Sequence, residues 1–144
     1  MYIHRQSSGF LLLVLLLPAA LCAVVAWTSR HWWLYLAVVA LVLVAWAFSS
    51  LTIEVNDQEL VSYFGPGVWR KRVPLSDIAA ATRTASTPFE GWGIRITPRG
   101  MLYNVSGLDD VEIGLAGGES FRLGTDEPDR LVAAIEEHMH RPNA

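Results

Sequence analysis

The chain has 144 residues, of which 52% are hydrophobic and only 17% are charged, against about 25% charged in an ordinary soluble protein. All 14 acidic residues lie at or after Glu54, so residues 49–144, with 9 basic side chains, carry a formal charge of −5. That acidity argues against general nucleic-acid binding, which requires Lys and Arg to neutralise phosphates. The single cysteine, Cys22, excludes an intrachain disulfide and a thiolate metal cluster.

Two charge-free apolar runs follow a short N-terminal tail, residues 1–9. Residues 10–27 would span about 27 Å as a helix, close to the roughly 30 Å hydrocarbon core, and residues 32–48 are about as long. Only residues 28–31 separate the runs, which leaves room for a tight turn, and Trp and Tyr flank that turn as they do at membrane interfaces. We therefore predict a hairpin of two transmembrane helices, 10–27 and 32–48.

A cleaved signal peptide is the alternative interpretation of the first run, because His4 and Arg5 precede an apolar core that ends in small residues. Either way, the second run delivers the following domain to the same side of the membrane. Arg5 and the cluster at 70–72 outnumber Arg30 in the turn, so the positive-inside tendency predicts a cytoplasmic domain on a multi-pass inner-membrane protein.

From Leu51 the pattern changes to short alternating segments separated by turn residues, which predicts about seven antiparallel strands in a sandwich or partly open barrel. Residues 111–115 and 121–123 are predicted to form a hairpin. A C-terminal α-helix is predicted from an apolar stripe at spacings of three and four residues, and it would cover one open end. The predicted soluble domain spans residues 49–140, with a tail at 141–144.

Four segments of this domain resemble the pleckstrin-homology-like (PH-like) domain of a bacterial family of small membrane proteins: 74–78 (PLSDI), 91–95 (GWGIR), 102–107 (LYNVSG) and 121–128 (FRLGTDEP). The resemblance covers about residues 51–138, and it implies seven strands, one closing helix and a membrane setting, but no reaction. Phosphoinositide recognition is not carried over. The loop that is basic in phosphoinositide-binding relatives reads NDQE here, at residues 56–59, and would repel a phosphate.

Two groups of residues are candidates for lipid or ligand contact. The cluster Arg70, Lys71 and Arg72 either rests on anionic headgroups, at about 1 kcal/mol for each cation near the surface, or is a solvated strand. Trp92 and Arg95 lie among glycines and either stack a ligand or belong to a bend in which Trp92 packs inward.

No residue is predicted to be catalytic, to bind a cofactor or to hold a metal. His138 and His140 are two residues apart and would face different sides of a helix, and no serine lies in a nucleophile motif. We therefore predict a non-enzymatic, membrane-anchored module that contacts lipids and binds an unidentified protein or another copy of itself. A lipid-headgroup or small-ligand sensor is the alternative, and a membrane-associated hydrolase is the third reading.

Overall fold

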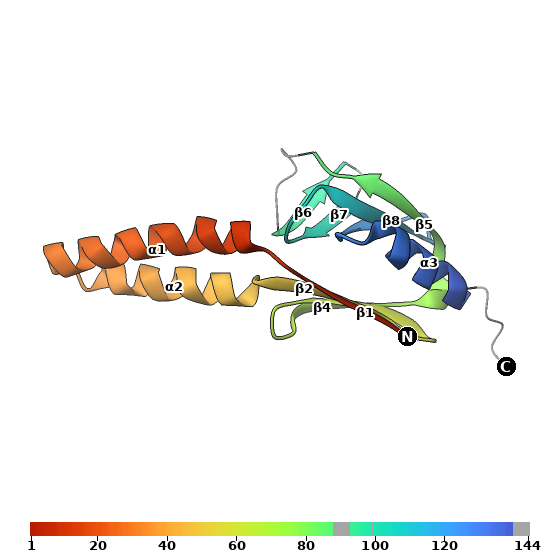
Figure 1. Ribbon diagram of the computed structural model, residues 1–144, viewed down its shortest axis with the longest axis horizontal. Coiled ribbons are helices and arrows are strands. Elements are labelled where there is room, and N and C mark those ends of the chain that lie inside the picture. The colour runs from red at the N-terminus through yellow and green to blue at the C-terminus, as the bar shows by residue number, and fades with distance from the viewer. Residues whose placement is uncertain (88–92, 99, 140–144) are drawn as a thin grey trace.

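The computed structural model describes residues 1–87, 93–98 and 100–139. Two antiparallel helices project from one end of a β domain, which consists of two sheets with a third helix between their edges (Figure 1). Trp92, His140 and the predicted tail 141–144 lie outside the described residues.

The projecting helices are α1 (Gly9–Ser29) and α2 (Trp33–Ala47), which pack against each other. The Ser8 hydroxyl caps α1 by accepting the Leu11 N–H at 3.0 Å, and Arg30 ends it in the left-handed conformation with φ 58°. By length and composition, α1 can cross a membrane, whereas α2 is equally apolar but has only 15 residues. The predicted helical hairpin is confirmed, with each end within two residues of its predicted position.

The N-terminal segment differs from its prediction, because most of the expected tail 1–9 is a strand. β1 (Tyr2–Ser7) precedes α1 and pairs antiparallel with β2 (Ser50–Val55), which follows α2. The helical hairpin returns the chain to its starting point, where the Ser8 N–H donates to the Ser49 carbonyl at 3.2 Å. The hairpin is therefore an insertion between two neighbouring strands of one sheet.

Nine strands form two sheets in the described residues, compared with about seven in the prediction. The first sheet, here called sheet A, has the order β1-β2-β3-β4 and is completed by β3 (Glu59–Phe64) and β4 (Val68–Pro74). The short 3-10 turn η1 (Leu75–Asp77) leads into sheet B, of order β5-β8-β9-β7-β6, whose strands are β5 (Ile78–Ala85), β6 (Gly93–Thr97), β7 (Gly100–Asn104), β8 (Asp109–Leu115) and β9 (Ser120–Gly124).

Sheet B also corrects the expectation of a uniformly antiparallel domain. The predicted hairpin is present as β8–β9, but it inserts between β5 and β7, which places β9 parallel to β7. All other strand pairs are antiparallel.

The core lies between the two sheets and is closed by α3 (Pro128–Met139). Leu131 and Ile135, on the predicted apolar stripe, are fully buried, and each contributes about 1.5–3 kcal/mol through burial. Just before the helix, the Thr125 hydroxyl accepts the Glu127 N–H at 3.1 Å and fixes the turn that leads into it. The predicted C-terminal helix and its closing position are thus confirmed.

Candidate functional site

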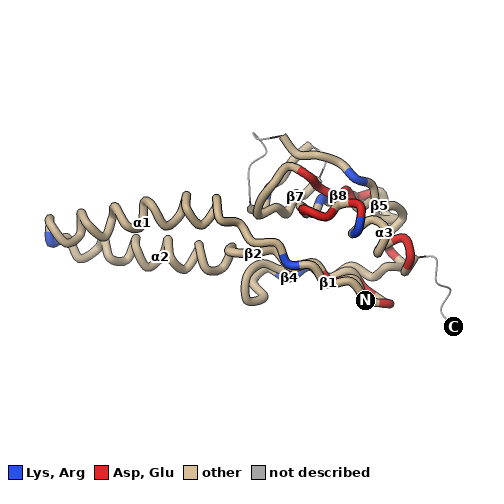
Figure 2. The backbone as a smooth tube through the Cα atoms, viewed as in Figure 1, with Lys and Arg blue, Asp and Glu red and all other residues tan. Residues whose placement is uncertain are grey.

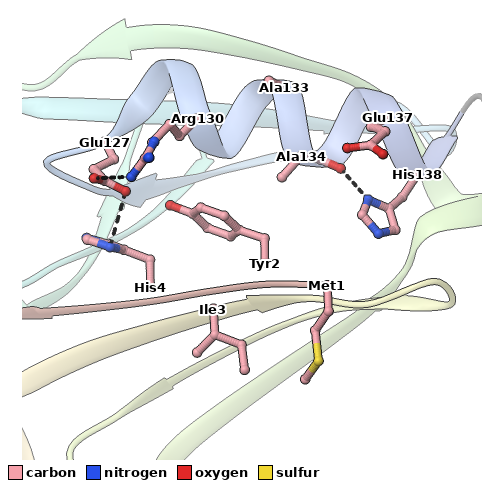
Figure 3. A pocket seen from close by; sticks show the side chains of 10 residues that line it. All are labelled: Met1, Tyr2, Ile3, His4, Glu127, Arg130, Ala133, Ala134, Glu137 and His138. Atoms are coloured by element: carbon pink, nitrogen blue, oxygen red, sulfur yellow. Dashed lines mark hydrogen bonds and ion pairs between the residues drawn. The ribbon is translucent and has the colours of Figure 1, made fainter.

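A cleft of about 590 Å³ opens between β1 and α3 (Figure 3). Met1 and the first three residues of β1 (Tyr2, Ile3 and His4) form one wall. The opposite wall consists of Glu127, Arg130, Ala133, Ala134, Glu137 and His138. Because β1 is the terminal strand of sheet A, the cleft runs along a sheet edge.

Histidine–carboxylate contacts join β1 to the start of α3. The His4 Nε2 lies 2.5 Å from the Asp126 Oδ1, and its Nδ1 lies 3.4 Å from the Glu127 Oε2. Glu127 also accepts from Arg130, at 2.9 Å. These carboxylates lie at the positive end of the helix dipole, and they hold the edge strand against that end.

A second histidine occupies the other end of α3. The His138 Nδ1 donates to the Ala134 carbonyl at 2.7 Å, and its Nε2 lies 3.4 Å from the Asp57 Oδ1 in the β2–β3 turn. Sheet A and α3 are therefore linked at both ends of the helix, while the wall between these links stays open.

The Tyr2 side chain points from β1 toward α3, as Figure 3 shows. Its hydroxyl is buried and has no hydrogen-bond partner among the described residues. Burial, with the nearby charges of Glu127 and Asp126, raises the pKa of Tyr2 to about 12. The cleft thus contains a protonated hydroxyl that a bound group is able to satisfy.

The predicted basic cluster does not form one patch. Strand alternation directs Lys71 toward the interior, where its Nζ lies 4.0 Å from the centroid of the Phe121 ring, a cation–π contact. Arg70 and Arg72 lie on the outer face of sheet A, with the Arg70 guanidinium 4.9 Å from the centroid of the Tyr63 ring. Lys71 therefore lies on the opposite face of β4 from Arg70 and Arg72, and headgroup contact by the three cations stays a prediction.

Arg5 takes the place of Lys71 on that outer face. It pairs with Thr52, which pairs in turn with Tyr63, so Arg5 lies in the same cross-strand row as the Tyr63 ring beneath Arg70.

The predicted pair Trp92 and Arg95 is described only in part. Arg95 is exposed on β6, at the edge of sheet B, and Trp92 lies outside the described residues.

A buried ion pair in sheet B was not anticipated from the sequence. Arg122 and Asp110 are fully buried, with the Arg122 Nη1 3.5 Å from the Asp110 Oδ2. Arg122 also donates to the Thr97 hydroxyl, and Asp110 accepts from Ser86. Because these contacts lie within the sheet rather than in the cleft, we assign them a structural role.

Residues 1–9 were predicted to form a tail, so Tyr2, His4 and Arg5 were not among the predicted site residues. The sequence YIHRQS carries little strand signal, because its two apolar residues are adjacent, and only the structure shows that every second side chain faces the core side of sheet A. No group of three or more His, Cys, Asp or Glu able to hold a metal occurs within residues 1–87, 93–98 and 100–139.

Comparison of the chain with protein-family models, with curated proteins and with solved structures finds no match in any of the three. Function is therefore inferred from the cleft and from the surface next to the helical hairpin. The resemblance to the PH-like family stays a prediction.

Proposed function

We propose that the protein is a two-pass, non-catalytic membrane protein whose cytoplasmic β domain binds an extended segment of a partner protein in the β1–α3 cleft. The observation that carries this proposal is the position of β1, which is both the edge of sheet A and one wall of the cleft. An edge strand offers backbone N–H and C=O groups to an added strand. The Tyr2 hydroxyl adds a polar group for the same occupant.

The two-pass topology is supported by the pairing of β1 with β2. These strands flank the helical hairpin and pair over six residues, so both ends of the hairpin lie on the same side of a membrane. A hairpin with α1 as a membrane span must then return through α2. The 15 residues of α2 cover about 22 Å, and the interfacial rings of Trp32 and Phe48 extend the apolar length.

The cytoplasmic side is supported by the distribution of basic residues. Figure 2 shows a basic position at the tip of the hairpin and none along the rest of its length. That position is Arg30, whereas Arg5, Arg70 and Arg72 lie at the end of the domain that joins the helices. The positive-inside tendency places the more basic side in the cytoplasm.

Reporter fusions test this topology. We expect alkaline phosphatase fused after Ala144 to be inactive and a cytoplasmic fluorescent reporter at the same place to be active. As the matched control, phosphatase inserted after Arg30, at the hairpin tip, should be active. Phosphatase activity after Ala144 would contradict the cytoplasmic assignment.

The non-catalytic assignment draws on the composition of the cleft. Its described lining contains two histidines and two carboxylates but no Ser, Thr or Cys to act as a nucleophile. The two facing sheets and the closing helix support a PH-like domain, to which β1 and the parallel β7–β9 pair are additions. A hydrolase remains the weaker alternative.

A photo-crosslinking amino acid at Ala133 tests the cleft in intact cells. Ala133 is exposed on the cleft wall, and the matched control is Ala116, which is exposed in the β8–β9 turn. We expect a crosslinked partner from position 133 and none from position 116. A product of two copies of the chain would support the self-association alternative, and monomer alone at both positions would contradict partner binding.

A further inference from the structure

We infer that the β3–β4 turn and the outer face of sheet A dock onto anionic phospholipid headgroups, so that the domain lies against the membrane instead of tumbling on its tether. This inference rests on the proposed two-pass topology, and it names a lipid surface as the second partner of the domain. Three observations support this inference: the position of the β3–β4 turn, the exposed aromatic side chain in that turn, and the arginines on the adjoining outer face of sheet A.

The β3–β4 turn is held against the end of α2. The Gly65 N–H donates to the Ser50 carbonyl at 2.8 Å, and the Phe64 and Phe48 rings have centroids 5.2 Å apart. Gly65 has φ 48°. A Cβ at this position would collide with the carbonyl oxygen of Ala47, which is the last residue of α2. The turn therefore lies at the level where α2 leaves the hydrocarbon, which is the headgroup level.

The turn presents apolar side chains at this level. Trp69 is 58% exposed and Val68 is 37% exposed. Trp69 has φ 50°, a left-handed conformation that costs a non-glycine residue on the order of 1–2 kcal/mol. Trp46, exposed in the last turn of α2, lies at the same level, and tryptophan is enriched at membrane interfaces.

Arginines give the adjoining surface its charge. Arg5, Arg70 and Arg72 are exposed on the outer face of sheet A, and the Arg5 Nε donates to the Ser50 hydroxyl at 3.2 Å, directly after the end of α2. The carboxylate of Glu54 on this face is engaged by the Tyr63 hydroxyl at 2.7 Å. The guanidinium group binds phosphate in a bidentate manner, so this charge is complementary to anionic headgroups.

The acidic end of sheet A points to the same orientation. Residues 56–59, in the β2–β3 turn, lie at the end of the strands opposite to the β3–β4 turn. Sheet A is thus basic and aromatic next to the helical hairpin and acidic at the distant end. That polarity favours contact with an anionic surface at the hairpin end only.

The test uses the full chain, with Cys22 replaced by Ala, in vesicles of phosphatidylcholine with or without phosphatidylglycerol. A fluorophore is attached to Trp69→Cys, or to Gln58→Cys in the β2–β3 turn as a control. With headgroup-located spin-labelled lipid, we expect strong quenching at position 69, more so with phosphatidylglycerol, and none at position 58. The triple change Arg5→Gln, Arg70→Gln and Arg72→Gln should abolish the phosphatidylglycerol-dependent part.

A charge-matched triple change, Arg83→Gln, Arg95→Gln and Arg130→Gln, should leave the quenching unaltered. A label at Val39→Cys in the middle of α2, read with a chain-located quencher, reports the two-pass topology separately. Quenching at position 39 without quenching at position 69, or quenching at 69 that ignores phosphatidylglycerol and the arginines, would overturn the docking inference alone. Absence of quenching at position 39 would overturn the proposed topology and the inference with it.

Discussion

Arg122 and Asp110 hold opposite charges inside sheet B, where neither side chain reaches solvent. An arginine does not give up its charge in a protein, so Arg122 depends on its acceptors to offset desolvation. The Asp110 carboxylate is one of those acceptors. Removing one partner of a buried ion pair leaves the other charge buried without its counter-ion, and this lowers the free energy of unfolding more than the loss of a surface ion pair does.

We predict that Asp110→Ala lowers the free energy of unfolding by about 3–5 kcal/mol, because Arg122 stays charged and buried. Asp109 is the matched control, since it is adjacent, about half exposed and bridged to Arg83 on the surface at 3.2 Å. Asp109→Ala should cost about 0–1 kcal/mol. Denaturant unfolding in detergent measures both, and equal losses would contradict the structural role of the buried pair.

Tyr2 gives a prediction in the alkaline range. Its pKa is about 12 in the folded protein and near 10 when unfolded, so the unfolded state loses its proton first. The resulting stabilisation is fully present below pH 10 and is lost as the pH rises through 12. We expect Tyr2→Phe to remove this part of the alkaline decline and, because the hydroxyl has no partner in the described residues, to be tolerated at pH 7.

The measurement is the melting temperature of both proteins between pH 8 and 12. The two curves should coincide near pH 8 and separate above about pH 10, where the melting temperature of the unaltered protein falls below that of Tyr2→Phe. Parallel curves over this range would show that Tyr2 titrates as an exposed tyrosine.

At the scale of elements, the β3–β4 turn shows how the helical hairpin and the β domain are joined. The turn contacts the last residues of α2 through backbone atoms, with no long side chain between them. Such a contact requires a residue without a side chain at position 65, in a conformation that favours glycine.

We predict that Gly65→Ala destabilises the protein by more than about 1 kcal/mol, because the added methyl group collides with backbone and φ is positive. Gly117→Ala is the control, since Gly117 lies in a turn with no atom within 4 Å of an added Cβ and no positive φ. Thermal unfolding in detergent compares the two variants. A tolerated Gly65→Ala would show that the turn does not lie against α2.

At the scale of the whole molecule, β1 makes the β domain discontinuous in sequence. Removal of residues 1–26 as a signal peptide would also remove β1 and leave β2 as an unprotected edge. We therefore predict that the N-terminal segment is retained in the mature protein, since the β domain uses β1 as its edge strand.

Two shortened chains test this. In the first, residues 9–48 are replaced by Asn-Gly, a two-residue turn suited to joining Ser8 with Ser49, whose backbones already hydrogen-bond at 3.2 Å. The second begins at Ser49 and lacks β1. We expect the first to be a folded, soluble monomer and the second to aggregate, as judged by gel filtration and circular dichroism; equal behaviour would show that β1 is dispensable.

The elements that the sequence predicted correctly are those with a strong local signal. The two apolar runs, the β8–β9 hairpin and the stripe of α3 each follow from periodicity and turn chemistry within a short stretch. Of the predicted basic cluster, Arg70 and Arg72 lie together on the outer face of sheet A, and their contact with headgroups stays a prediction.

Only the tertiary structure decided the features that join distant residues. Residues 2–7 read YIHRQS, without the apolar–polar alternation that would indicate a strand, and β1 exists because the helical hairpin returns β2 beside it. The parallel β7–β9 pair, the Arg122–Asp110 pair and the His4–Asp126 contact likewise join residues 12 to 122 positions apart. Local periodicity determines which stretches form helices and strands, whereas the order of strands in the sheets determines which side chains meet in the cleft.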